Sequence, residues 1–182
     1  VKQSYEMARM LFEQAAQQGY VTAMSHLGYM YDNGEGVEKS YERAKEYYEQ
    51  AAHLGYADAQ FNLGVLYDNG RGVAQSNTTA AALYEQAAQQ GHSGAMNNLG
   101  IMYAKGQEVE RDIIKARELF TNAVALGDND AINALLQLDA YERQVAALDS
   151  NAVICSFCGL PQTSTRNFSK TKCPCKSTWY CN

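Results

Sequence analysis

The chain has 182 residues, 46% of them hydrophobic, and a formal net charge of −5 at pH 7. A body of this size and apolar content can bury a continuous core, but the last 32 residues cannot do so without metal or disulfide cross-links. No apolar run is long enough to span a membrane and no signal-peptide pattern begins the sequence, although we expect the natural N-terminus to lie upstream of Val1.

Most of the chain repeats with a period of 36 residues. The register aligns Ala23 with Ala59, Ala95 and Ala131, Leu27 with Leu63, Leu99 and Leu135, and Ala8 with Ala44, Ala80 and Ala116. Within each half of a repeat these residues follow one another at spacings of three and four, which is typical of a helical face. Each repeat is therefore predicted to contain two helices.

Capping residues mark the ends of the second helix of each repeat. A serine or aspartate precedes it, where the side-chain oxygen can accept a hydrogen bond from a free backbone amide. A glycine follows it and can form a C-terminal cap. The caps are Ser4, Ser40, Ser76 and Asp112 at the beginnings and Gly19, Gly55, Gly91 and Gly127 at the ends.

Glycine pairs stand between the two helices of a repeat, Gly34 with Gly36 and Gly70 with Gly72. They predict tight turns with left-handed backbone angles, and no phosphate-binding signature accompanies them. In the third complete repeat Glu108 replaces the second glycine, so we expect a strained or different turn there.

Three further glycines, Gly28, Gly64 and Gly100, lie inside the first helices. Glycine in a helix costs about 1 kcal/mol relative to alanine, so a compensating close approach of neighbouring helices is expected. We expect this approach at the seam between repeats, which Leu27, Tyr31 and their counterparts fill.

The pattern A-x-x-x-L-G-x-x-Y-x-x-G-x-G-V at residues 23–37 and 59–73 resembles the Sel-one-like repeat (SLR) family, relatives of tetratricopeptide repeats. The resemblance covers about residues 4–135 and implies a right-handed superhelix whose concave face binds other proteins. Residues 131–148 keep Ala131 and Leu135 but carry Leu136 where the glycine stood, which is typical of a capping helix.

All five cysteines lie in the last 28 residues, as Cys155, Cys158, Cys173, Cys175 and Cys181. Two closely spaced pairs predict a tetrahedral zinc site. A disulfide framework and a redox Cys-x-x-Cys are the alternatives, and the odd number of cysteines argues against the first.

This module is similar to the beginning of a MYND-type zinc finger, because the cysteines are followed by Lys176, Ser177 and Tyr180 in the family's order. The likeness implies that Cys155, Cys158 and Cys181 share one zinc and that Cys173 and Cys175 belong to another. The remaining ligands of that pattern are not in the sequence, and Cys173 and Cys175 lie one residue closer than usual. For residues 155 onward the likeness also implies a finger that recruits a second protein by binding a short proline-containing peptide.

Charge and histidine placement argue against nucleic-acid binding and catalysis. Residues 151–182 contribute +4, so the remainder carries −9 and would repel phosphate. His26, His53 and His92 are dispersed, and no triad or paired-carboxylate constellation recurs. Nucleic acid and membrane are therefore not expected partners, and the chain is predicted not to be an enzyme.

Together these patterns predict an all-α solenoid at residues 1–148, a linker at 149–154 and a partial zinc finger at 155–182. The predicted function is an intracellular protein-interaction scaffold, in the cytoplasm or nucleus, whose groove binds a helix or peptide. Two alternatives stay open: the regulatory part of an enzyme, such as a ubiquitin ligase component or a methyltransferase, and a secreted repeat protein with disulfides. The predicted groove residues are His26, Tyr29, Asn62, Val65, Asn98 and Ile101.

Overall fold

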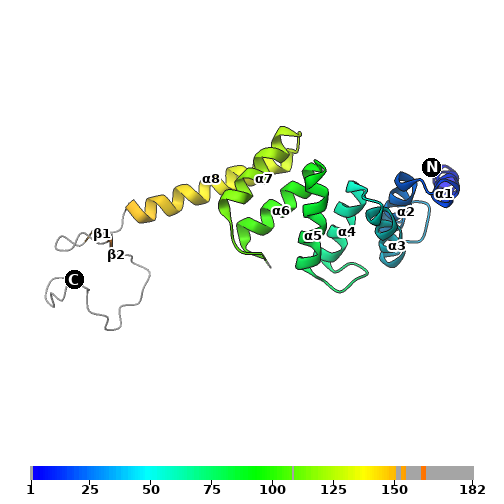
Figure 1. Cartoon of the computed structure of the whole chain (residues 1–182), viewed down its shortest axis with the longest axis horizontal. Helices are drawn as coiled ribbons and strands as arrows, with labels where there is room; N and C mark the ends of the chain where they lie inside the picture. Colours follow the sequence, from blue (N-terminus) through cyan, green and yellow to red (C-terminus); the bar gives the residue numbers. More distant parts are fainter. Residues whose placement is uncertain (1, 108, 151–152, 155–160, 163–182) are drawn as a thin grey trace. The chain divides into compact units, whose positions relative to one another are not determined.

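The computed structural model describes residues 2–107, 109–150, 153–154 and 161–162 (Figure 1). These residues form eight helices and two short strands. The helices are α1 (Lys2–Gln17), α2 (Val21–Asn33), α3 (Tyr41–His53), α4 (Ala57–Asn69), α5 (Asn77–Gln89), α6 (Ser93–Lys105), α7 (Ile113–Ala125) and α8 (Asn129–Ser150), and the strands are β1 (Val153–Ile154) and β2 (Pro161–Gln162). The predicted all-α repeat architecture is confirmed.

The chain divides into two compact units, residues 1–135 and residues 136–182. In the second unit, β1 and β2 pair antiparallel, with Val153 opposite Gln162 and Ile154 opposite Pro161. Apart from Pro161 and Gln162, the predicted zinc finger lies outside the described residues, and so do all five cysteines and Glu108, where a strained or different turn was expected. The domain boundaries predicted from the sequence stay predictions.

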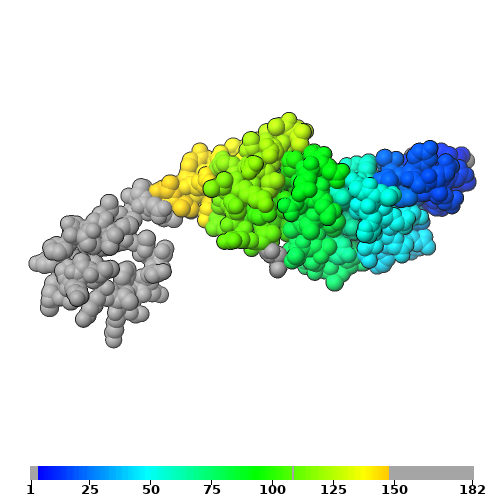
Figure 2. Space-filling view, in the orientation of Figure 1, coloured from blue at the N-terminus to red at the C-terminus, as the bar shows by residue number. Residues whose placement is uncertain are grey.

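In the first unit, each repeat is a pair of helices that packs on the next pair. The first helices α2, α4 and α6 contact the second helices α3, α5 and α7 of their own repeats. The second helices α1, α3 and α5 also pack on the first helices that follow them, α2, α4 and α6. Figure 1 shows the helices succeeding one another in chain order, and Figure 2 shows their side chains closely packed from α1 to α7. The core therefore runs through the array rather than filling one centre.

The predicted caps are present with one exception. Ser40, Ser76 and Asp112 accept hydrogen bonds from the backbone amides of Arg43, Thr79 and Lys115, respectively. The prediction for Ser4 is wrong, because α1 already begins at Lys2 and Ser4 lies inside it. The four predicted C-terminal glycines all have positive φ, between 82° and 88°.

The turn within a repeat needs glycine for two reasons. Gly36 has a φ of 70°, and a Cβ atom placed on it would lie 2.4 Å from the Cβ of Tyr5 in α1. Gly72 repeats the arrangement, with a φ of 65° and a Cβ that would lie 2.6 Å from the Cβ of Tyr41. The turn therefore packs directly onto the beginning of the preceding second helix, where no side chain fits.

The glycines inside the first helices serve a different contact from the one expected. A Cβ atom on Gly28, Gly64 or Gly100 would lie 2.6 to 2.7 Å from the ring of Tyr48, Tyr84 or Phe120, respectively. Each of these rings belongs to the second helix of the same repeat, so the close approach lies within the repeat and not at the seam between repeats. Because glycine has no side chain, the ring can lie directly against the helix backbone. All three rings are almost fully buried.

We expect the substitution Gly28→Leu to lower the free energy of unfolding by about 1 to 3 kcal/mol, because the new side chain overpacks the contact with Tyr48. Chemical denaturation with a circular dichroism readout measures the change. The substitution Ala82→Leu, at an exposed position of α5, is the control and should have little effect. Equal stability of Gly28→Leu and the parent would contradict the packing described here.

Candidate partner-binding face

The six predicted groove residues occupy two positions of each first helix. His26, Asn62 and Asn98 hold one position in α2, α4 and α6, and Tyr29, Val65 and Ile101 hold the position three residues later. Residues three apart lie on the same side of a helix. We call this side of the three helices the first-helix face.

The earlier of the two positions lies at the junction with the preceding repeat. The ring of His26 stacks on Phe12 of α1, with the ring centroids 4.9 Å apart. Asn98 of α6 hydrogen-bonds to the hydroxyl of Tyr84 in α5. These side chains therefore have structural contacts of their own, which leaves the later position as the more available one.

The later position carries an apolar residue in every complete repeat. The Tyr29 side chain is 48% exposed. Val65 and Ile101 are half-buried, and Val65 packs against the cluster that contains Tyr84 and Leu99. We call Tyr29, Val65 and Ile101 the apolar row; their binding role stays a prediction.

A hydroxyl network beneath this face was not anticipated from the sequence, where the tyrosines were interpreted as core residues. The hydroxyl of Tyr84 donates to the Asp68 carboxylate on α4, at 3.4 Å, and also hydrogen-bonds to Asn98. Burial of the phenol is the main reason that the pKa of Tyr84 is raised. The signal was present in the repeat register, where Asp32, Tyr48 and Asn62 stand at the same three positions one repeat earlier.

The earlier copy of this network is incomplete. The Tyr48 side chain is fully buried, and its hydroxyl has no hydrogen-bond partner among the described residues. Burial, followed by the charge of Asp32 and the neighbouring Tyr29, raises the pKa of Tyr48. Burial also raises the pKa of Asp32, although Arg71 and Lys39 oppose that rise.

His92 is the N-cap residue of α6 and contacts the preceding first helix, α4. Its Nδ1 atom accepts a hydrogen bond from the backbone amide of Ala95 at 3.1 Å, and its ring stacks on Phe61 with centroids 4.4 Å apart. Its Nε2 atom lies 3.6 Å from Asp58 Oδ1. Burial lowers the pKa of His92, and the charges of Asp58 and Asp128 oppose the decrease.

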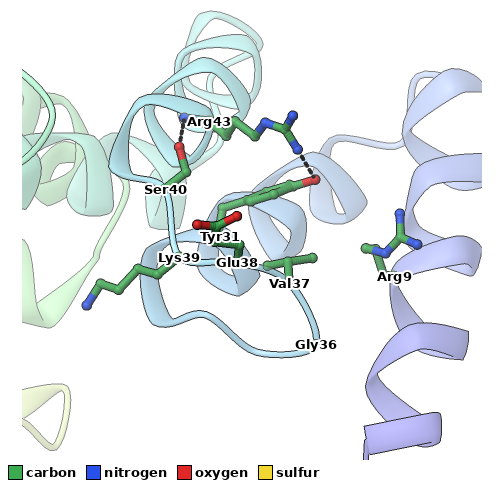
Figure 3. Close-up of a pocket in the computed structure, with 8 residues that line it drawn as sticks. All are labelled: Arg9, Tyr31, Gly36, Val37, Glu38, Lys39, Ser40 and Arg43. Atoms are coloured by element: carbon green, nitrogen blue, oxygen red, sulfur yellow. Dashed lines mark hydrogen bonds between the residues drawn. The ribbon is translucent and has the colours of Figure 1, made fainter.

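A separate polar pocket lies between α1, the turn after α2 and the beginning of α3 (Figure 3). It has a volume of about 540 Å³ and is lined by Arg9, Tyr31, Gly36, Val37, Glu38, Lys39, Ser40 and Arg43. Arg43 donates to the Tyr31 hydroxyl at 3.2 Å, and Arg9 pairs with Glu13 at 2.6 Å. Both guanidinium groups are therefore already engaged, and we do not assign this pocket a ligand.

The described part of the chain contains neither a candidate membrane span nor a cluster of metal-binding side chains. None of its helices combines the length and the hydropathy that a membrane crossing needs. Its histidine, aspartate and glutamate residues form no group of three or more that could hold a metal ion. The predicted zinc ligands, Cys155, Cys158, Cys173, Cys175 and Cys181, lie outside the described residues.

The helix pairs, their register and their capping define an all-α helical repeat solenoid. Four copies of the Sel1 repeat match the chain, at residues 1–20, 21–56, 57–92 and 93–128. The chain belongs to the Sel1 repeat family, whose members generally act as protein-interaction scaffolds rather than catalysts. The matched repeats end at residue 128, so the zinc finger is not part of this assignment.

Several solved structures are similar to this chain. A Sel1 repeat protein from Oxalobacter formigenes matches 73% of the chain at 34% identity with a TM-score of 0.69, and 53% of that protein is covered. A protective antigen of uropathogenic Escherichia coli with an SLR fold matches 74% at 34% identity and a TM-score of 0.69, with 29% of its own length covered. Cysteine rich protein B of Helicobacter pylori matches 70% at 26% identity and a TM-score of 0.54, with 96% covered.

The chain thus spans about half of the first of these structures and less than a third of the second, at 53% and 29%. No curated protein matches the chain.

The substitutions Tyr84→Phe and Tyr48→Phe should differ in their effect on stability. Tyr84→Phe removes a hydroxyl with two partners and should lower the free energy of unfolding by about 0.5 to 1.5 kcal/mol. Tyr48→Phe removes a buried hydroxyl without a partner and should leave stability unchanged or slightly higher. Parallel urea titrations measure both, and an equal loss in the two variants would show that the two networks do not differ.

The cap on α6 should make the protein less stable in mild acid. Because folding lowers the pKa of His92, the unfolded chain binds the proton more readily, and stability falls as the pH drops below the ordinary histidine pKa of about 6.5. His92→Asn keeps a capping oxygen that does not titrate. Urea unfolding at about pH 7.5 and about pH 5.5 should show a smaller loss for His92→Asn than for the parent, and identical losses would disprove a contribution from His92.

Proposed function

We propose that this chain is a protein-interaction scaffold whose first-helix face binds a helix or an extended segment of a partner protein. The apolar row carries the proposal. Tyr29, Val65 and Ile101 recur at one position of three successive first helices, whereas the exposed ends of the same helices are polar, with Asn33, Asn69 and Lys105. Aromatic and aliphatic side chains held on a rigid scaffold are the usual anchors of such interfaces.

The half-exposed ring of Tyr29 is the best single anchor for this test, because its removal should disturb the fold little. Peptides selected from a random display library on the full chain serve as probes. We expect Tyr29→Ala to weaken their binding by about tenfold, as loss of an interface anchor usually does.

Ile114 provides the matched control for this experiment. It is an apolar residue that is 82% exposed, and it lies on α7, a second helix, so it is not part of the first-helix face. Ile114→Ala should leave peptide binding unchanged. If Ile114→Ala weakened binding and Tyr29→Ala did not, the first-helix face would be the wrong surface.

We further propose that the cysteines of residues 155–182 bind zinc and that this module recruits a second protein through a proline-containing peptide. The pairing of β1 with β2 supports the first part, because it brings together the two ends of the segment that carries Cys155 and Cys158. Two thiolates on one short connection suit tetrahedral zinc. Reduced, metal-bound thiols would suit an intracellular location.

Native mass spectrometry of the full chain under reducing conditions tests the zinc proposal. We expect bound zinc that is lost in the double substitution Cys155→Ser and Cys158→Ser, while the helical circular dichroism signal of the repeats persists. Absence of zinc together with oxidised thiols in the protein as isolated would favour the disulfide alternative.

A further inference from the structure

α1 is a second helix whose inner side is only partly covered. In the repeat register Phe12 corresponds to the rings that lie on the helical glycines, Tyr48, Tyr84 and Phe120. Those three rings are 0 to 2% exposed, whereas Phe12 is only half-buried. α1 packs on α2, the first helix of the following repeat (Figure 1). No described helix takes the place beside α1 that α2, α4 and α6 take beside α3, α5 and α7.

Three large apolar side chains of α1 are exposed near Phe12. Met7, Met10 and Leu11 are 59%, 52% and 59% exposed, and spacings of three and four place them on one side of the helix. The residues at the position of Met10 in the other second helices are Glu46, Ala82 and Glu118. A contiguous apolar surface, at a position that is charged or small elsewhere, indicates a binding site for an apolar partner. We call Met7, Met10, Leu11 and Phe12 the α1 patch.

The complete repeats show which kind of helix fits the ring of Phe12. In each of them a first helix packs there, and its glycine lies directly on the aromatic ring. A Cβ atom on Gly28, for example, would lie only 2.6 Å from the ring of Tyr48. The equivalent contact with Phe12 therefore requires a helix that has glycine at the point of contact.

The tyrosine three residues after this glycine makes the second contact. Tyr31 accepts a hydrogen bond from Arg43 at 3.2 Å and stacks on Tyr47, with the ring centroids 5.7 Å apart. In the register, Met7 and Leu11 stand at the positions of Arg43 and Tyr47. Methionine and leucine suit an aromatic ring as well, because a thioether packs favourably against it. The helix that fits the α1 patch therefore has the pattern Gly-x-x-Tyr.

The described helices of a second copy of this chain do not offer such a helix. The glycines of α2, α4 and α6 are already covered by the rings of their own repeats. α8 carries Leu136 and Asp139 at the positions that glycine and tyrosine hold in α6. A leucine side chain at the glycine position would overlap the ring of Phe12, since even a Cβ atom comes too close in the complete repeats.

We propose that the α1 patch binds a helix of a partner protein that carries Gly-x-x-Tyr, with its glycine on Phe12 and its tyrosine against Met7 and Leu11. The residues equivalent to Met10 stay exposed beside the first helices of this chain. Burial of Met10 therefore requires an occupant that extends beyond the edge of one such helix, as a separate protein does. This site belongs to α1 and is distinct from the first-helix face of α2, α4 and α6.

A labelled synthetic peptide with the sequence of residues 57–72, which include α4, is the probe, because it contains Gly64 and Tyr67. Fluorescence anisotropy during titration with the full chain should show saturable binding. Gly64→Leu in the peptide should weaken binding by about tenfold or more, because the leucine overlaps Phe12. Leucine favours the helix more than glycine does, so lower helicity would not cause this loss. Undiminished binding of the Gly64→Leu peptide would overturn the proposal.

The substitution Leu11→Ala in the full chain tests the site itself and should weaken peptide binding by about fivefold or more. Leu54→Ala is the matched control, because Leu54 follows α3 and is 61% exposed, and it should leave binding unchanged. Circular dichroism melting checks that both variants stay folded. Equal peptide binding by the parent and Leu11→Ala, or equal losses in Leu11→Ala and Leu54→Ala, would contradict the assignment to the α1 patch.

Two further outcomes identify a different occupant or a different surface. We expect no self-association through this patch in sedimentation equilibrium of the chain alone; a dimer that Leu11→Ala abolishes would show that a second copy covers it and would overturn the proposal. Peptide binding that is lost in Tyr29→Ala and kept in Leu11→Ala would place the peptide on the first-helix face. That result would overturn the α1 site and leave the proposed function standing.

Discussion

The contact between an aromatic ring and a bare stretch of helix backbone determines how every repeat is assembled. Tyr48, Tyr84 and Phe120 lie on Gly28, Gly64 and Gly100, where even a methyl group would come within 2.6 to 2.7 Å of the ring. Burial of such a ring stabilises the pair more than the helical glycine destabilises it, since an aromatic side chain buries a large apolar area. The distance between paired helices, and therefore the position of each first helix at the face, follows from this contact.

The same aromatic residue also determines whether a polar group lies in the core between the helices. In two repeats the aromatic residue is tyrosine, and the hydroxyl of Tyr84 donates to Asp68 of its own repeat and interacts with Asn98 of the next first helix. A change from tyrosine to phenylalanine at this position alters no hydrophobic contact, but it decides whether a carboxylate and an amide can be accommodated at the junction. The character of the proposed face is thus set by residues that lie beneath it.

Much of the fold could be predicted because the repeat supplies the same information several times. Helix pairs, three of the four N-terminal caps and the glycine turns follow from local rules that act within a few residues. The error at Ser4 shows the limit of such rules, because a residue that suits a cap can also be accommodated inside a helix, and Ser4 lies inside α1, which begins at Lys2. The partner of the helical glycines was misjudged because spacing along one helix does not reveal which neighbouring helix approaches it.

The face was harder to predict than the fold for a physical reason. His26 and Asn98 belong to a position that differs between repeats, as positions that contact a partner often do. Both instead interact with the preceding second helix, because His26 stacks on Phe12 and Asn98 hydrogen-bonds to Tyr84. Gln60 shows the same limit: it is buried and accepts a hydrogen bond from Gln90 at 2.7 Å, although methionine and leucine, Met24 and Leu54, hold the two positions one repeat earlier. A polar pair in one repeat therefore takes the place of an apolar pair in another, and the sequence reveals this only when both positions of the pair are compared between repeats.

The glycines that follow the second helices differ from the turn glycines in their surroundings. A Cβ atom on Gly19, Gly55, Gly91 or Gly127 would meet nothing within 4 Å, whereas Gly36 and Gly72 are pressed against the preceding helix. The joints between repeats are therefore the uncrowded points of the chain, and duplication or loss of one whole repeat there preserves every type of contact. Recombination at these joints can lengthen or shorten the array without redesigning its core, and this also makes the length of the face an adjustable property.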